Sequence, residues 1–521
     1  VTGGTGLVTN LYGGAEQRIV TGQGSATNVV GGLQNIFSDG TGTIDTMYNG
    51  SQTVQIDGSG LINVMSSGIQ YAIDGYAHIN TMVGGEQQGY NYAKLSIDTM
   101  NGGRQLISSG VRGSIGVVNK GNQIIYYSGE GTIGTLAGGG QTISSGGIGT
   151  IGSLVSGGQL IYSGAKGRIV TMNAGATQVI SSGGIGTADT MNGGKQEVFG
   201  SGTIGNMNSG IQNIYTGGSG TITNQSGGIQ NVASGAAGVV ATMQAGLQNI
   251  AGGGSGTVGV MNSGNQEIAD GASGIVNTMN SGVQKIAGGG SGTVDVLNGG
   301  VQDVNNLGLG TVNTMNGGTQ AIANSGSGTI TTMANGLQDI ADGGSGIVTT
   351  MNGGTQAVAN SGSGTVTTMT NGLQNIASGG SGTVSALNGG LQNINAGGTG
   401  TANVNGGTQD VYGSAVSTTV LGGTQILHSG GTLSKNILNG GTQNIASGAT
   451  LKADASGAEL TVQAAVISNG TQNVLEDGTA EGFILTSNGV QNVMGLAVST
   501  TMEQGGVQNI NNNGLAMGAM V

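Results

Sequence analysis

Few residues in this chain could do acid–base chemistry, and those that could are spaced by a repeat. Charged residues make up only 7% of the 521 residues. Glu267, Lys285 and Asp303 take equal positions in three successive repeats, so stacked repeats would bring them together on one outer face. The catalytic interpretation is a groove of the kind that cuts polysaccharides. We favour a cross-strand ladder of alternating charge on a solvated face, because no histidine joins the group.

Histidine and cysteine usage argues further against a catalytic or metal site. His78 and His428 lie far apart in the sequence, so we do not expect them to share a site. The absence of cysteine excludes disulfides and thiolate metal sites. Gly288–Leu297 is close to a calcium-binding nonapeptide but lacks Asp at the required place. We therefore predict no catalytic residue, no metal and no cofactor.

A row of serines is the remaining candidate for chemistry. When positions are numbered from the repeated glutamine (position 0), the serines stand at +7, in a Gly-rich turn. They are either ordinary turn residues or a row of O-glycosylation or hydrogen-bonding sites. The row comprises Ser219, Ser255, Ser273, Ser291, Ser327, Ser345, Ser363 and Ser381.

These positions belong to one repeated unit. A Gln recurs every 18 residues, with Gly at −2 and Ile or Val at +2. Self-similarity at a fixed short period indicates a solenoid, whose units contact only their neighbours. The regular glutamines are Gln212, Gln230, Gln248, Gln266, Gln284, Gln302, Gln320, Gln338, Gln356, Gln374 and Gln392.

The elements that carry these residues must be strands. Gly occupies 115 positions, mostly at fixed places in the repeat, where it acts as turn punctuation. The short segments between are rich in Val, Ile and Thr, which favours strands, and helices would not survive this density of Gly. We predict an all-β chain forming a single-stranded parallel β-helix, with one coil per repeat and about 28 coils.

The repeat also predicts what lies inside. Positions 0 and +2 share a face by strand alternation, and the Ile or Val at +2 must supply the core. The Gln then points inward as well, and stacked amides can donate and accept along the axis. We interpret the glutamines as an internal amide ladder; the alternative is that they persist from recent duplication without a role. Positions −8 and −5 break the alternation, which predicts a corner or bulge between them.

Regularity varies along the chain. Residues 1–200 are expected to form less regular coils, 201–450 a highly regular solenoid, and 451–521 degenerate coils with an insertion at 451–466. Within the first part, Glu86–Leu95 departs from the motif and predicts a bulged coil or loop.

Composition also restricts partners and location. Eleven basic and 23 acidic residues give a net charge of −12 without a basic stripe, so nucleic acid is not an expected partner. No apolar run is long enough to span a bilayer as a helix. The chain begins close to the repeat pattern, so we expect that any signal peptide has been removed or was not included.

Segments such as Asn439–Gly448 (NGGTQNIASG) and Ser226–Gly235 (SGGIQNVASG) carry a resemblance. They resemble the short repeats of bacterial autotransporter adhesins, most closely the self-associating and often heptosylated ones. The resemblance implies a right-handed parallel β-helix that is exported and displayed at the cell surface or shed. It also implies adhesion to host surface or matrix receptors, association with like molecules, and glycan modification.

Three functions follow, in order of preference. The first is a non-enzymatic extracellular adhesin or self-association rod, which acts through multivalent contacts along repetitive polar faces. The second is a structural subunit of an extracellular filament or matrix, built by stacking of solenoids end to end or side to side. The third is a carbohydrate-processing β-helix, in which Asp303 would be needed for activity.

Overall fold

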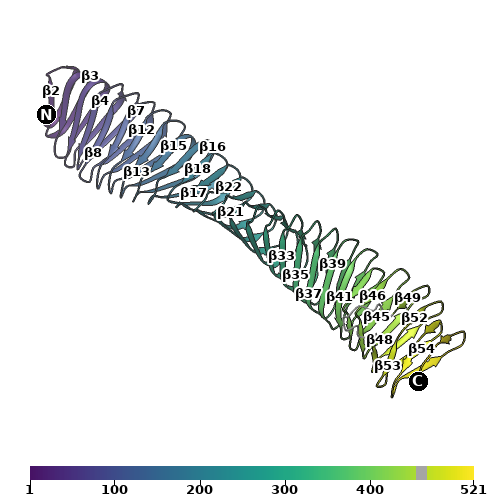
Figure 1. The fold of residues 1–521 in the computed structure, drawn as a ribbon. Helices are drawn as coiled ribbons and strands as arrows, with labels where there is room; N and C mark the ends of the chain where they lie inside the picture. Colours follow the sequence, from purple (N-terminus) through teal and green to yellow (C-terminus); the bar gives the residue numbers. More distant parts are fainter. Residues whose placement is uncertain (453–465) are drawn as a thin grey trace. The chain divides into compact units, whose positions relative to one another are not determined.

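The computed structural model describes residues 1–452 and 466–521, and these consist of strands and turns without a helix. They form a parallel β-solenoid of about 28 turns with an 18-residue spacing (Figure 1). Away from the two ends, the strands of the regular coils pair with their equivalents one repeat before and one repeat after. The predicted fold class is therefore confirmed. Over the same residues, no helix could cross a membrane.

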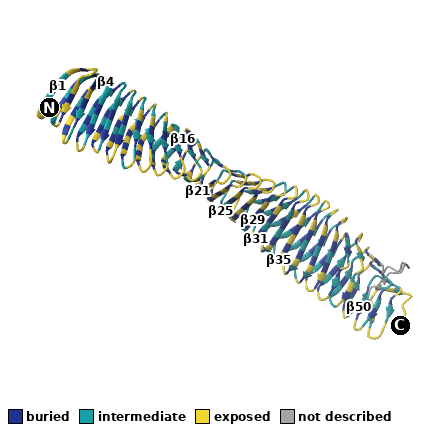
Figure 2. Cartoon of the chain, turned by 60° about the vertical axis from the view of Figure 1, so that its left-hand side comes forward, coloured by how far each residue is buried: buried dark blue, intermediate teal, exposed yellow. Residues whose placement is uncertain are grey.

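One regular coil contains a long strand and a short strand. In β37 (Ser363–Met369), Gly364, Val366 and Met369 are buried, while β38 (Leu373–Ile376) buries Gln374 and Ile376. The two strands face each other across a thin core of these side chains, and buried residues line the inside of the coils (Figure 2). The alternation slips by one residue after Val366, which lets both Val366 and Met369 point inward. This slip is the break in alternation that the sequence predicts between −8 and −5.

Two glycines of the regular coil are needed for steric reasons. Gly372, in the turn between the strands, has a φ of +105°, and a Cβ there would lie 2.9 Å from the carbonyl oxygen of Gly354. Gly364 lies opposite the core glutamine, where a Cβ would lie 2.8 Å from Gln356 Oε1 and 2.5 Å from Val358 Cγ2. Glycine at this second position therefore makes room for the amide inside the coil.

The chain divides into two compact units, Val1–Gly259 and Val260–Val521, called unit 1 and unit 2 below. In unit 1 the expected loop at Glu86–Leu95 is wrong. Glu86–Tyr90 is the regular strand β8, which pairs in register with β6 (Ile69–Ile73) and β10 (Arg104–Ile107). Gln87 takes the glutamine position in β8. The coil from Gln70 to Gln87 is one residue shorter than the 18-residue repeat, and a turn between its strands absorbs the difference.

Unit 2 becomes less regular toward its C-terminal end. After β41 (Thr399–Val404) the long strand is split into two shorter ones, β43 (Ser414–Val416) and β44 (Thr419–Val420), with Thr418 buried between them. Most of the insertion expected at 451–466 lies outside the described residues. Gln472 still bonds to Gln443 although 29 residues separate them, so this coil is longer than the others.

Candidate functional site

The repeated glutamines lie inside the coils and bond to one another. In unit 1, Nε2 of Gln230 donates to Oε1 of Gln212 at 2.7 Å. In unit 2, Nε2 of Gln374 donates to Oε1 of Gln356 at 2.6 Å, and also lies 3.3 Å from the carbonyl oxygen of Gly364 on the opposite strand. The amides are therefore paired along the axis and tied across the core. Because the donors and acceptors of these amides are paired inside the coil, the ladder stabilises the coil and leaves no polar group for a ligand to bind.

The +7 serines form an outward row at the start of the long strands. They are exposed except for Ser327, which is half-buried. Their place is the first residue of the strand rather than the turn before it, as Ser363 in β37 shows. Ser381 pairs in register with Ser363, which pairs with Ser345, so the hydroxyls of neighbouring coils lie side by side. The row is interrupted twice, by Ala237 after Ser219 and by Leu309 between Ser291 and Ser327.

The charged row at +1 does not form the expected ion ladder. Glu267, Lys285 and Asp303 do stack in register on β26 (Asn265–Ile268), β28 (Val283–Ile286) and β30 (Val301–Val304). No ion pair joins these three side chains, and Asp303 instead accepts a hydrogen bond from Asn305 on its own coil. An ion pair between solvent-exposed side chains contributes little, so Asp303 bonds to the nearby amide of Asn305 instead.

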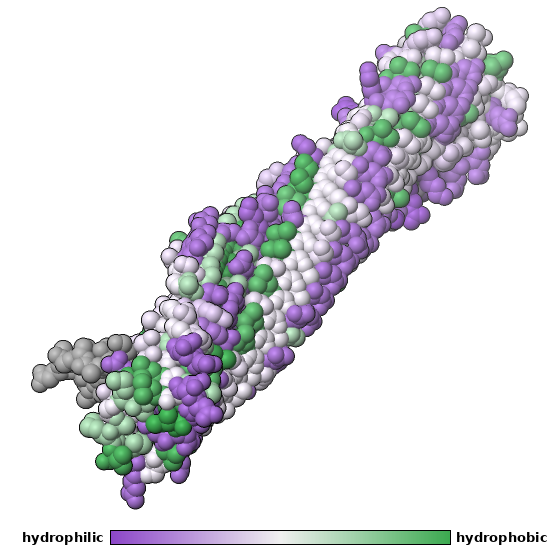
Figure 3. All heavy atoms as spheres, turned by 90° about the vertical axis from the view of Figure 1, so that its right-hand side faces the viewer, coloured by the Kyte–Doolittle hydropathy of each residue, from purple (hydrophilic) through white to green (hydrophobic). Residues whose placement is uncertain are grey.

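Asparagine amides form further ladders on the surface. In unit 2, Asn280 donates to Asn262 at 2.8 Å and Asn298 donates to Asn280 at 2.9 Å. Asn316 continues this row by donating to Asn298 at 3.0 Å. Figure 3 shows hydrophilic side chains gathered in bands, with hydrophobic ones in narrow rows beside them. The polar surface is therefore ordered in advance by its own hydrogen bonds.

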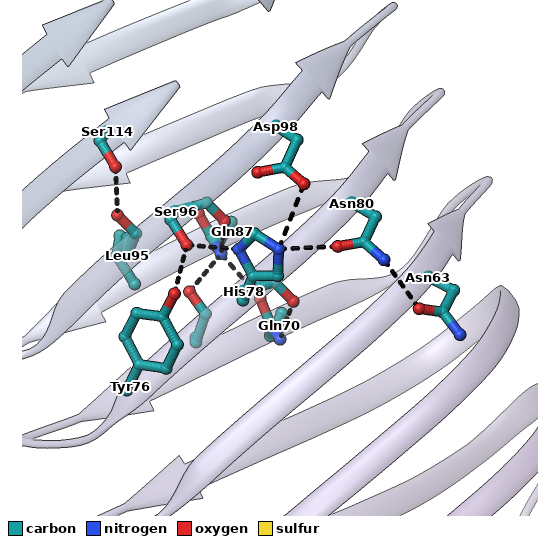
Figure 4. Close-up of polar contacts among 11 residues, drawn as sticks. Asn63, Gln70, Tyr76, His78, Asn80, Gln87, Leu95, Ser96, Asp98 and Ser114 are labelled. Atoms are coloured by element: carbon teal, nitrogen blue, oxygen red, sulfur yellow. Dashed lines mark hydrogen bonds and ion pairs between the residues drawn. The ribbon is translucent and has the colours of Figure 1, made fainter. Parts of the chain in front are cut away.

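A cluster around His78 in unit 1 was missed by sequence reasoning (Figure 4). His78 lies on β7 (Tyr76–Met82), and its Nδ1 is 2.5 Å from the hydroxyl of Ser96 on β9 (Lys94–Met100). Its Nε2 is 2.7 Å from Asn80 Oδ1 and 3.4 Å from Asp98 Oδ2. The Nδ2 of Asn80 donates to Asn63, so Oδ1 is the acceptor and Nε2 carries the proton. Nδ1 is then free to accept the Ser96 proton.

This cluster contains the contact between a serine and a base that nucleophilic catalysis requires, but not an oxyanion site. Strands β7 and β9 are each paired on both sides, with β5 (Ser59–Met65), with each other and with β11 (Arg112–Val118). Their backbone N–H groups are therefore committed to neighbouring carbonyls. The hydroxyl of Tyr76 is a further partner of Ser96, at 3.0 Å. The arrangement is a hydrogen-bonded network on a flat sheet face.

The second histidine makes a separate set of contacts, in unit 2. The His428 ring stacks on Tyr412 with centroids 3.9 Å apart, and its Nε2 lies 3.9 Å from Asp410 Oδ1. Across the described residues, no group of three or more His, Cys, Asp or Glu side chains could hold a metal ion.

In each of two surface pairs, the carboxylate raises the pKa of its partner. The hydroxyl of Tyr215 donates to Glu197 at 2.5 Å, and this hydrogen bond raises the pKa of Tyr215, with burial and the carboxylate charge adding to it. The carboxylate of Asp189 raises the pKa of Arg168 in the same way, by a hydrogen bond and by charge.

Comparison with known proteins adds little to this geometry. No family model and no curated protein sequence matches the chain. One similar solved structure is described as a TibC-catalyzed hyper-glycosylated TibA55-350 fragment, at 20% identity and a TM-score of 0.16, with 82% of this chain and 99% of that chain covered. At that TM-score the two backbones do not superpose as wholes. The fold and the surface rows stand on the strand pairing and hydrogen bonds given above.

Proposed function

We propose that the chain is a non-enzymatic adhesive β-solenoid that acts outside the cell or at its surface. One observation carries the proposal: equivalent polar side chains stack coil after coil into outward rows, as the paired Ser345, Ser363 and Ser381 do. Such a row repeats one weak contact many times, and repeated contacts add in free energy once the first has formed. A second copy of the chain or a surface receptor is the expected partner.

Three further features support adhesion over catalysis. The core amides are used up inside the coils, the His78 cluster lacks oxyanion donors, and Asp303 bonds to Asn305 rather than to a second acid or base. The row of +7 residues from Ser219 to Ser381 contains no charged side chain, so it does not repel the same row of a second copy.

The test is display of the full chain on cells that do not otherwise clump. We expect displaying cells to aggregate with one another, or to bind a coated surface better than cells without the chain. Equal behaviour of the two populations would refute the proposal. Electron microscopy of the purified chain separates adhesion from polymerisation, because continuous fibres would favour a filament subunit instead.

Glycan modification of the +7 serine row belongs to the same proposal. All of these hydroxyls except that of Ser327 are exposed, and they recur at the same position of successive coils, so a transferase could reach them one after another. Intact-mass measurement of native material tests this directly, since a mass equal to that of the bare chain would rule out glycan modification.

A further inference from the structure

Unit 1 carries an alternating row of aromatic rings and serines that the proposed function does not use. The row stands at +3, where the short strands end, and reads Tyr90, Ser108, Tyr126, Ser144, Tyr162, Ser181 and Phe199. The alternation stops at the next coil, where the ring of Tyr215 stacks on Phe199 with centroids 4.3 Å apart. The backbone N–H of Tyr126 donates to the carbonyl of Ile107 one coil before, and the same bond recurs coil by coil. The row is therefore straight and held in register by the sheet.

The rings are exposed, although the coil does not need them. The exposed fractions are 43% for Tyr90, 39% for Tyr126, 46% for Tyr162 and 42% for Phe199. In the coils of unit 2 from Gln266 to Gln374 the same position is alanine in all but one, and those coils have the same strands and core. The alanines are Ala269, Ala287, Ala323, Ala341, Ala359 and Ala377. A row of half-exposed rings that folding does not require indicates a binding surface.

The spacing of the rings narrows the chemistry of the ligand. Neighbouring coils lie about 4.8 Å apart, so rings on every second coil lie about 9.6 Å apart, with a serine hydroxyl between them. In an extended β-linked polysaccharide the sugar turns over at each linkage, so every second sugar presents the same face. The length of that disaccharide repeat is close to the spacing of the rings. Each ring could then stack on the C–H face of one sugar, and each serine could bond to hydroxyls of the next.

The surroundings of the row fit an uncharged ligand. Beside it, at +1, lie the half-buried apolar side chains of Leu106, Ile124 and Leu160. At the Tyr90 end, Arg104 Nη2 is 3.0 Å from Glu86 Oε2, so these two charges offset each other. At the Phe199 end, the carboxylate of Glu197 is engaged by the hydroxyl of Tyr215. The hydroxyl of Tyr90 donates to Gln88 Oε1 at 2.7 Å, which fixes that ring before any ligand arrives.

We propose that this tyrosine–serine row of unit 1 binds an extended, uncharged, β-linked polysaccharide along the direction in which the coils stack. The proposal deepens the adhesive function by naming a ligand class, and it rests on that function in treating the outer face as a binding surface. A second copy of the chain is the competing occupant of the row.

The experiment uses the full chain and measures binding of cellohexaose and chitohexaose by isothermal titration calorimetry. Maltohexaose, whose α-linkages curl the chain, serves as the ligand control. We expect both β-linked probes to bind, and Tyr126→Ala/Tyr162→Ala to weaken binding at least tenfold. Tyr126→Phe/Tyr162→Phe should keep most of the affinity, because the ring face and not the hydroxyl makes the contact. Tyr412→Ala, which removes an exposed ring at the same position in unit 2, should have no effect.

A gain-of-binding variant keeps the proposal falsifiable if the double alanine variant misfolds. Ala323→Tyr/Ala359→Tyr places two rings two coils apart in unit 2, and it should add a second binding site.

No binding of either β-linked probe, equal binding of maltohexaose, or unchanged binding by Tyr126→Ala/Tyr162→Ala would overturn the proposal. If the chain forms a dimer that dissociates in Tyr126→Ala/Tyr162→Ala, and neither glycan binds, the row would be assigned to contact with a second copy of the chain. Cells that still clump when glycan binding fails would leave the adhesive function standing and reject only this inference.

Discussion

Gln302 shows at the scale of one residue why the core of each coil contains an amide. Its Nε2 donates to Gln284 Oε1 at 2.7 Å and lies 3.3 Å from the carbonyl of Gly292, while its Oε1 accepts from Gln320 Nε2 at 2.7 Å. Both polar atoms are therefore satisfied in a place that water does not reach. An amide is the neutral side chain that can donate and accept in this way and repeat itself indefinitely.

Gln302→Leu keeps the volume of the side chain but breaks this ladder. Gln284 Oε1 loses its donor and Gln320 Nε2 loses an acceptor, and each buried unpaired group costs about 1–3 kcal/mol. We expect the free energy of unfolding to fall by roughly 2–5 kcal/mol in urea denaturation followed by circular dichroism. Asp303→Asn, on the neighbouring outward residue, should change it by less than about 0.5 kcal/mol. Equal losses from the two variants would contradict the ladder's role.

Gln225 is the exception at the −5 position, where it lies between Met207 and Met243 of the adjoining coils. Its Oε1 is buried without a hydrogen-bond partner, although its Nε2 reaches the carbonyl of Gly228 at 3.1 Å. Gln225→Met restores the residue of the neighbouring coils and removes the unpaired atom. We expect it to raise the free energy of unfolding by about 1–3 kcal/mol. The reverse change, Met243→Gln, should lower the free energy of unfolding. An increase on Met243→Gln would contradict this explanation.

At the scale of the elements, strand alternation accounts for what could be predicted. Placing Ile376 in the core places Gln374 there too, and the break between Val366 and Met369 follows from the same count. The His78 cluster was missed for a specific reason: Gln87 was assigned to a loop. Without Gln87 in the ladder, nothing shows that His78 and Ser96 stand at the same position of adjacent coils. The ion ladder predicted for Glu267, Lys285 and Asp303 was wrong, because register determines which residues are neighbours but not which side chains bond.

The register between two short strands also determines the pKa of one tyrosine. Strands β18 (Lys195–Val198) and β20 (Ile211–Ile214) pair so that the hydroxyl of Tyr215 reaches Glu197. The raised pKa of Tyr215 means that the folded chain holds this proton more tightly than the unfolded chain. The contact therefore stabilises the fold below about pH 10 and loses that contribution as the pH rises through the folded pKa.

The expected result is a late tyrosine in an alkaline titration followed by tyrosinate absorbance. Glu197→Gln removes the carboxylate, so one tyrosine should ionise at lower pH than in the unaltered chain. Tyr215→Phe should remove the same late step altogether. If the curves of Glu197→Gln and the unaltered chain superpose, the pair does not exist in solution.

At the scale of the whole molecule, the proposed adhesion depends on the repetition of small contacts. A single exposed serine or asparagine would bind nothing well, since one hydrogen bond contributes about 1 kcal/mol net. The same group repeated on successive coils gives many such contacts to a partner that is itself repetitive. The core ladder serves this end, because it keeps successive coils in one register and so keeps the outward rows straight.

Adhesion should therefore weaken by a constant factor for each serine removed from the row. We expect Ser345→Ala, then Ser363→Ala, then Ser381→Ala to reduce the binding constant of coated beads about fivefold each, because about 1 kcal/mol is lost at every step. Ser263→Ala/Ser281→Ala, which removes exposed hydroxyls from the opposite turns, is the matched control and should leave adhesion unchanged. Circular dichroism melts confirm that all variants fold. A logarithm of binding that falls linearly with the number of substitutions supports the multivalent row, whereas complete loss at one serine would indicate a single localised site instead.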